Sequence, residues 1–189
     1  MTEIIRCDWA NGSEALRAYH DQEWGVPLHG DAALFEFLVL EGAQAGLSWR
    51  AVLDRRAAYR AAFHGYDIDR VAAMTDAEVG AVLSGSGIIR NRLKVLSVRA
   101  NARAALGVIA SEGSLDAYLW SFVDHHPIIN AWTRASEVPA RTERSDAMSR
   151  DLRKRGFGFV GSTICYAFMQ ATGMVNDHLT RCVCRTGAG

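Results

Sequence analysis

The stretch that decides the fold is residues 34–49, LFEFLVLEGAQAGLSW. Asp31 precedes it as a good N-cap, and apolar side chains then recur on one helical face. That face carries Leu34, Phe37 and Leu38. Glu41 continues the same face, where a carboxylate costs free energy unless it gains a partner. Two interpretations stay open: Glu41 turns outward at the helix end before Gly42, or it forms the floor of a pocket for donor groups or a cation.

Helical periodicity also dominates the rest of the chain, and alternating strand patterns are scarce, so the sequence predicts an all-α fold. The expected helices lie near residues 13–22, 31–41, 48–63, 67–73, 76–84, 91–111, 114–122, 145–155, 160–172 and 177–184. A length of 189 residues with 49% hydrophobic composition suits a single domain, 1–189, with two lobes around a shared core. The longest irregular segment is 124–144, which could separate these lobes.

The formal net charge of zero does not by itself indicate a nucleic-acid binder. The distribution of charge is more informative, because no acidic residue lies between Glu78 and Glu112. The same interval holds Arg90, Arg92, Lys94, Arg99 and Arg103. Such a cluster predicts either a face that holds a phosphate backbone or a helix face that contacts only solvent.

No apolar run approaches the roughly 20 residues that a membrane span needs. The first residues, MTEIIRC, lack the basic start and apolar stretch of a secretory signal. We therefore expect a cytoplasmic protein without a membrane partner. Nothing in the pattern indicates a large apolar partner surface, so a monomer is expected.

Cysteine and histidine residues near the two ends of the chain suggest a metal site. His178 and Cys182 are four residues apart in the expected helix 177–184, so they share one helical face. Cys7 and His20 lie near the other end. Two thiolates and two imidazoles make a closed tetrahedral zinc site, which would be structural and would join the ends of the chain.

Other interpretations of these residues stay open. Each Cys or His could be an ordinary core residue, and Cys184 is an alternative ligand, although six residues from His178 it points away from the shared face. Cys165 lies in an apolar run and is expected in the core. A catalytic zinc is disfavoured, because neither the deaminase signature nor H-E-x-x-H occurs.

Aromatic residues and a glycine hairpin complete the candidate features. Trp9, Tyr19, Trp24 and Trp49 surround the positions discussed above. Together with a buried acid, they would suit a flat, cationic ligand such as a methylated purine. Residues 85–94, GSGIIRNRLK, form a glycine turn that runs into a basic helix. Such a turn either cradles a phosphate or only connects two helices.

Taken together, these features resemble the 3-methyladenine DNA glycosylase I family, over nearly the whole chain and in the same order. The matching motifs are Cys7–Trp9, Ala18–Pro27, Leu40–Trp49, Gly87–Arg90, Trp120–Val123, Arg155–Gly161, Thr163–Tyr166, Met169–Gln170 and Val175–His178. One departure is Asp8, where a small glycine would sit comfortably beside Trp9.

The resemblance implies a helix-hairpin-helix glycosylase fold with one structural zinc ion, and it assigns roles by residue. The zinc ligands would be Cys7, His20, His178 and Cys182. Glu41, the candidate catalytic residue, would be the acidic side chain that reads the methylated base. Tyr19 and Trp49 would stack on the base, and Trp9 and Trp24 would line the pocket. The DNA contacts would be Leu47, which fills the gap of a flipped nucleotide, and the hairpin residues Gly87, Arg90, Arg92 and Lys94.

The function that the resemblance implies is excision of 3-methyladenine from double-stranded alkylated DNA. Because N3-methylation already makes adenine a good leaving group, little acid catalysis is required; Asp116 and Asp124 are weak candidates for stabilising the sugar cation. Lys94 fits a phosphate contact better than a lyase nucleophile, so a monofunctional enzyme that leaves an abasic site is expected. Two alternatives remain: a module that binds alkylated DNA without cleaving it, and a zinc-dependent hydrolase of free nucleobases.

Overall fold

The protein is described by a computed structural model that covers residues 4–85 and 87–186. The α-helices are α1 (Glu14–Gln22), α2 (Asp31–Gln44), α3 (Trp49–Leu53), α4 (Arg56–Ala62), α5 (Ile68–Ala73), α6 (Asp76–Ser84), α7 (Arg92–Glu112), α8 (Leu115–Trp120), α9 (Glu143–Lys154) and α10 (Ser162–Ala171). Short 3-10 turns lie at Asp8–Gly12, His64–Tyr66, Ser121–Val123, Ala135–Glu137 and Val183–Thr186. The strands β1 (Ile128–Ile129) and β2 (Val175–Asn176) pair in parallel. This mostly helical architecture confirms the predicted all-α class, apart from the small strand pair.

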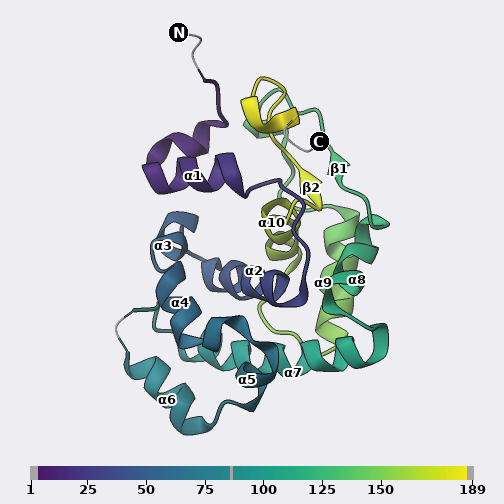
Figure 1. The fold of residues 1–189 in the computed structure, drawn as a ribbon. Helices are drawn as coiled ribbons and strands as arrows, with labels where there is room; N and C mark the ends of the chain where they lie inside the picture. The colour runs from purple at the N-terminus through teal and green to yellow at the C-terminus, as the bar shows by residue number, and fades with distance from the viewer. Residues whose placement is uncertain (1–3, 86, 187–189) are drawn as a thin grey trace.

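Helix α2 occupies the centre of the molecule, with α3, α7, α8 and α10 packed around it (Figure 1). All side chains from Leu34 to Ala43 are buried. A helix that is apolar on nearly all sides is stable only when other elements cover it completely. The sequence predicted one buried face, and the structure buries every face of the helix between Leu34 and Ala43, including the acids Glu36 and Glu41.

Capping side chains fix the N-termini of several helices. Thr75 and Glu78 form a capping box at the start of α6, and Ser48 caps α3 by accepting a hydrogen bond from the Ala51 amide. The prediction for Asp31 was wrong: it is the first residue of α2 behind Gly30, and its carboxylate accepts from the Asp116 amide instead.

The predicted single helix 48–63 is divided into α3 and α4, with Asp54 and Arg55 between them. The backbone at Arg55 has a ψ of 4°, which turns the chain at the boundary.

The predicted helix 177–184 does not form. Its backbone groups pair with other segments instead: the Thr180 amide donates to the Trp132 carbonyl at 2.8 Å, and the Val183 amide donates to the Ile5 carbonyl at 2.9 Å. Because these donors are committed to distant partners, the segment is a loop that ends in a 3-10 turn. Figure 1 shows the consequence, with α1 and the C-terminal segment side by side.

None of the helices in the described parts of the chain has the length and apolar character that a membrane span requires.

Candidate active site

A cavity of about 420 Å³ lies between α1, α2, α3, α10 and the segment around residues 135–140. It is lined by all five side chains that the sequence assigned to a pocket. These are Trp9, Tyr19, Trp24, Glu41 and Trp49. Residues that are 40 positions apart in the sequence thus meet around one space, which is large enough to enclose most of a small ligand.

Part of the lining was missed by the sequence analysis. From α10 come Thr163, Tyr166, Ala167 and Gln170; further lining residues are Gln44, Val138, Pro139 and Asp177. The α10 residues follow the three-to-four residue period of one helix face, so their joint orientation was readable from the sequence. The contribution of residues 135–140 was not, because it depends on how an irregular segment crosses the cavity.

The aromatic side chains form a continuous set of edge and tilted contacts. The ring centroids of Trp9 and Trp24 are 5.1 Å apart with an interplanar angle of 77°, and those of Tyr19 and Trp49 are 5.1 Å apart at 46°. Trp24 also packs edge-on against the His178 ring at 4.7 Å. Such contacts add to the packing energy and hold each ring in a defined orientation.

Glu41 is the buried acid of the cavity, since only 4% of its surface is exposed. Of the two interpretations left open, the outward-facing one was therefore wrong. Its Oε2 atom has no hydrogen-bond partner among the described residues, and neither has the buried Nε1 of Trp49. Desolvation raises the pKa of Glu41 to about 8. One unpaired acid and one unpaired donor in the same cavity indicate that a polar ligand completes the site.

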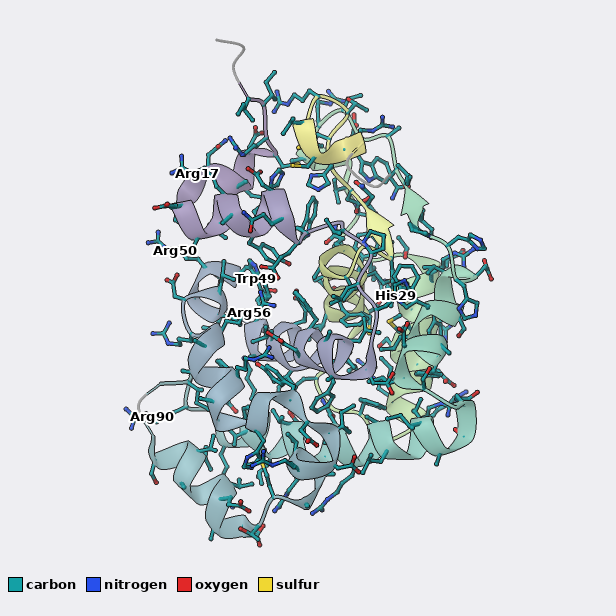
Figure 2. All side chains as sticks on the ribbon, in the orientation of Figure 1. Arg17, His29, Trp49, Arg50, Arg56 and Arg90 are labelled. Carbon is teal, nitrogen blue, oxygen red and sulfur yellow. The ribbon has the colours of Figure 1, made fainter. Side chains whose placement is uncertain are left out.

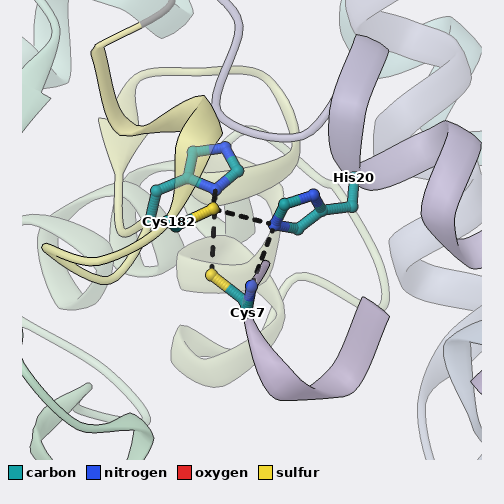
Figure 3. A group of neighbouring side chains, drawn as sticks. Cys7, His20 and Cys182 are labelled. Atoms are coloured by element: carbon teal, nitrogen blue, oxygen red, sulfur yellow. Dashed lines mark hydrogen bonds between the residues drawn. The ribbon is translucent and has the colours of Figure 1, made fainter. Parts of the chain in front are cut away.

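The four predicted metal ligands converge beside this cavity. Figure 3 shows Cys7, His20 and Cys182 pointing toward one another, and the ligand atoms of these residues and His178 all lie within 4.8 Å of one another. Cys182 Sγ is 3.4 Å from His20 Nε2 and 3.4 Å from His178 Nδ1, and Cys7 Sγ is 3.8 Å from His178 Nδ1. In a tetrahedral zinc site, sulfur and nitrogen ligands are about 3.6 Å apart. The donor set and its spacing therefore fit one zinc ion.

Neighbouring groups orient the two imidazoles. His20 Nδ1 lies 2.8 Å from a carboxylate oxygen of Asp21, which Arg6 also contacts, and His178 Nε2 lies 2.9 Å from the Trp24 carbonyl. These contacts leave the other ring nitrogens facing the cluster, as in histidine metal sites. Cys184 lies 3.9 Å from His20 Nδ1, the nitrogen that faces away from the cluster, which disfavours it as an alternative ligand.

The hairpin between α6 and α7 packs tightly against α4. A Cβ atom at Gly87 would lie 2.7 Å from the Ala58 Cβ, so glycine is required for this close approach. The neighbouring Ser86 lies outside the described residues. Arg90 and Arg92 are exposed after the turn, and Leu47, in the connection between α2 and α3, is 42% exposed.

The basic residues predicted around this hairpin differ in what their charged groups contact. Lys94 Nζ donates to the carbonyls of Ala43 and Ala45 at 2.8 and 2.6 Å, so its ammonium caps the C-terminus of α2, unlike the predicted phosphate contact. Arg99 and Arg103 donate to carbonyls at the end of α5. Arg90, Arg92 and Arg103 are exposed, and Arg99 is half-buried. Arg90 and Arg92 are thus the exposed arginines beside the hairpin, whereas the exposed Arg103 is held by a carbonyl on α5.

An edge of exposed arginines was not foreseen. Figure 2 shows Arg17, Arg50 and Arg90 along the same edge of the molecule, with Trp49 nearby. They come from α1, α3 and the hairpin. The sequence analysis named only Arg90, because Arg17 and Arg50 belong to no local basic cluster. We call Arg17, Arg50 and Arg90 the arginine edge.

The two weak candidates for stabilising a sugar cation lie elsewhere. Asp116 accepts from the Gly30 amide at 2.6 Å, and Asp124 pairs with Arg144 at 3.0 Å. Neither lines the cavity.

Comparisons with known proteins agree with this geometry. The family model described as methyladenine glycosylase matches residues 9–186. DNA-3-methyladenine glycosylase 1 of Escherichia coli (strain K12) is 48% identical over 182 residues, which cover 96% of this chain and 97% of that protein. A crystal structure of 3-methyladenine DNA glycosylase I is 49% identical, with a TM-score of 0.93 and coverage of 95% and 99% of the two chains. Another structure, a variant in complex with 3-methyladenine, is 29% identical, with a TM-score of 0.93 and coverage of 97% and 99%. The chain belongs to the methyladenine glycosylase family.

Proposed function

We propose that this protein is a DNA glycosylase that excises 3-methyladenine from double-stranded alkylated DNA. The observation that carries the proposal is the buried, unpartnered carboxyl of Glu41 in an aromatic cavity. A 3-methyladenine nucleotide offers a flat, cationic ring with an exocyclic amine at its edge. Tyr19 and Trp49 stack on such a ring, and Glu41 accepts a hydrogen bond from the amine.

The base reaches the cavity by rotating out of the duplex. Leu47 is exposed near the cavity and fills the gap that the extruded nucleotide leaves. The arginine edge holds the flanking phosphates, and α6, the hairpin and α7 act as a helix-hairpin-helix element that grips the backbone near Gly87. N3-methylation makes the adenine a good leaving group, so the pocket supplies selectivity while water completes the hydrolysis of the glycosidic bond.

The enzyme is monofunctional and leaves an abasic site. A lyase step needs an amine nucleophile near the sugar, and no lysine lies among the described residues that line the cavity. Lys94 is committed to two carbonyls of the protein. Incubation with abasic duplex and borohydride should therefore trap no covalent adduct.

One zinc ion, held by Cys7, His20, His178 and Cys182, has a structural role because four protein ligands leave no open position. It joins the segments near the two ends of a single domain, residues 1–189, built of two lobes. The enzyme acts as a monomer in the cytoplasm. Metal analysis, size-exclusion chromatography and cell fractionation test these points.

Release of free 3-methyladenine from methylated duplex DNA tests the function. The native protein is compared with Glu41→Gln at equal metal content, and a large loss in the variant supports both the activity and the role of Glu41. Equal release by both keeps the activity and moves the base-reading acid elsewhere. Binding of methylated duplex without any release supports a damage-binding module instead, and turnover of free nucleobases supports a hydrolase.

A further inference from the structure

The connection between α2 and α3 is a short turn over residues 44–47, which we call the Leu47 turn. Ala45 is the C-cap of α2 and Ser48 is the N-cap of α3, so only Gly46 and Leu47 separate the two caps. Gly46 has a φ of 78°, a conformation that favours glycine, and the Leu47 amide donates to the Gln44 carbonyl at 2.6 Å. Leu47 itself is 42% exposed. The fold therefore presents an exposed apolar side chain from a turn whose backbone is restrained on both sides.

Lys94 binds main-chain carbonyls at the start of the Leu47 turn. Its Nζ atom donates to the carbonyl of Ala43 at 2.8 Å and to that of Ala45 at 2.6 Å. The last carbonyls of a helix have no partner within the helix and carry partial negative charge, so they favour an ammonium group. The Lys94 amide in turn donates to the side chain of Asn91, the N-cap of α7, at 3.1 Å. Lys94 thus joins the first turn of α7 to the Leu47 turn.

Helix α7 also binds a carbonyl of α5 through a basic side chain. Arg103 donates to the Ala72 carbonyl at 2.9 Å, near the end of α5. The two contacts are chemically alike, but only the carbonyls that Lys94 binds belong to the segment that leads into Leu47. Lys94 also follows the exposed Arg92 of the hairpin by two residues. The same short segment therefore carries an exposed cation and holds the Leu47 turn.

We propose that Lys94 is a positioning residue that holds the Leu47 turn in the conformation in which Leu47 fills the gap of an extruded nucleotide. The inference deepens the proposed function and rests on it. Without this contact the turn would have to become ordered when DNA binds, at a cost in conformational entropy. Two of the three ammonium hydrogens of Lys94 are used by carbonyls of the protein, so the residue acts through the turn and not through a phosphate.

Lys94→Met tests the proposal, because methionine is of similar length and has no hydrogen-bond donor. Release of 3-methyladenine from methylated duplex is measured in a single turnover at saturating concentrations of metal-loaded protein, and its rate should fall about tenfold relative to the native protein. The affinity for free 3-methyladenine, followed by tryptophan fluorescence, should change less than about twofold, because other contacts position Glu41 and the aromatic rings. A native release rate in Lys94→Met, or an equal loss of affinity for the free base, would overturn the proposal.

Arg103→Met is the matched control, because it removes a contact of the same kind from the same helix. Its release rate should stay within about twofold of the native rate. A loss equal to that of Lys94→Met, with the two variants melting at the same temperature, would reduce both residues to general packing and contradict the proposal. Lys94→Gln, whose uncharged side chain is one bond shorter, takes the place of Lys94→Met if the latter does not fold, and the same outcomes apply.

A double variant separates an action through Leu47 from an independent one. In a protein that already carries Leu47→Ala, adding Lys94→Met should lower the release rate by less than about twofold, because the side chain that the contact positions is gone. A further loss of about tenfold would show that Lys94 acts on the substrate in another way, and the proposal would fall. It would also fall if Lys94→Met reduced the slope of log affinity for duplex against log salt by about 1, because that decrease marks a direct phosphate contact.

Binding to a duplex that already lacks a base keeps the test independent of turnover. The native protein should bind a duplex with a tetrahydrofuran abasic-site analogue more tightly than undamaged duplex, and Lys94→Met should lose about tenfold in affinity for the analogue duplex. If the native protein releases no 3-methyladenine yet shows these differences, the glycosylase function fails while the role of Lys94 stands. If release occurs but Lys94→Met binds the analogue duplex as tightly as the native protein does, the inference alone fails.

Discussion

Replacing Glu41 by glutamine should stabilise the folded protein at neutral and alkaline pH while it weakens base excision. The carboxyl is buried in a largely apolar and aromatic cavity whose described lining holds no lysine or arginine, and its pKa rises from 4.5 to about 8. The unfolded chain therefore ionises this group first as the pH rises. Stability is unaffected below the unfolded pKa and is lost progressively between about pH 4.5 and pH 8.

The size of the effect follows from the shift. Each unit of pKa corresponds to about 1.36 kcal/mol, so the penalty is about 3 kcal/mol at pH 7 and approaches about 5 kcal/mol above pH 8. Glutamine does not ionise and carries none of this penalty. The stability of Glu41→Gln relative to the native protein should therefore grow by about 3 kcal/mol between about pH 5 and about pH 8.

Urea unfolding of both proteins at these two pH values measures the difference. Protonation of the cysteine and histidine cluster changes with pH as well, but it contributes equally to both proteins and cancels. A stability difference that stays constant with pH would refute the assignment of Glu41 as a buried acid that is protonated at neutral pH.

Three further predictions concern metal, hairpin and DNA backbone. Cys182→Ser, or treatment of the native protein with a strong chelator, should lower metal content and thermal stability together; unchanged melting after complete metal loss would contradict a structural ion. Gly87→Ala should destabilise the protein by about 1–3 kcal/mol because the new methyl meets Ala58, and a thermal melt as stable as native would show that the hairpin can shift. Arg90→Ala should weaken binding to any duplex and reduce the slope of log affinity against log salt by about 1, whereas Arg103→Ala, whose guanidinium donates to a carbonyl at the end of α5, should leave the slope unchanged.

Local chemistry made much of the fold predictable. The capping box of Thr75 and Glu78 and the cap at Ser48 place helix starts where the structure has them, because these interactions involve neighbours in the chain. The expected helix 177–184 failed for the opposite reason. The four-residue spacing of His178 and Cys182 fits a helix, but ligands can also converge from a loop whose backbone is bonded to distant segments.

In the candidate site, too, the residues with a local sequence signal were predictable, and those that depend on distant segments were not. Glu41 was identifiable because an acid on an apolar face is conspicuous in a sequence. Asp177 was not, because its environment is assembled from α10 and the segment around residues 130–132, which the sequence left irregular. Lys94 was misjudged as a phosphate contact since the carbonyls that it caps are about 50 positions away along the chain.

The proposed metal site and the base pocket share direct side-chain contacts. These contacts explain why a structural ion would matter for recognition of the base. Trp24 stacks on the His20 ring at 6.1 Å, meets the His178 ring edge-on at 4.7 Å and touches Trp9 at 5.1 Å. His20 and His178, two of the four proposed ligands, thus pack against Trp24, and His20 also packs against Trp9. Loss of the ion would release the imidazoles first and the indoles with them, so the affinity for the base should fall before the helical core around α2 unfolds.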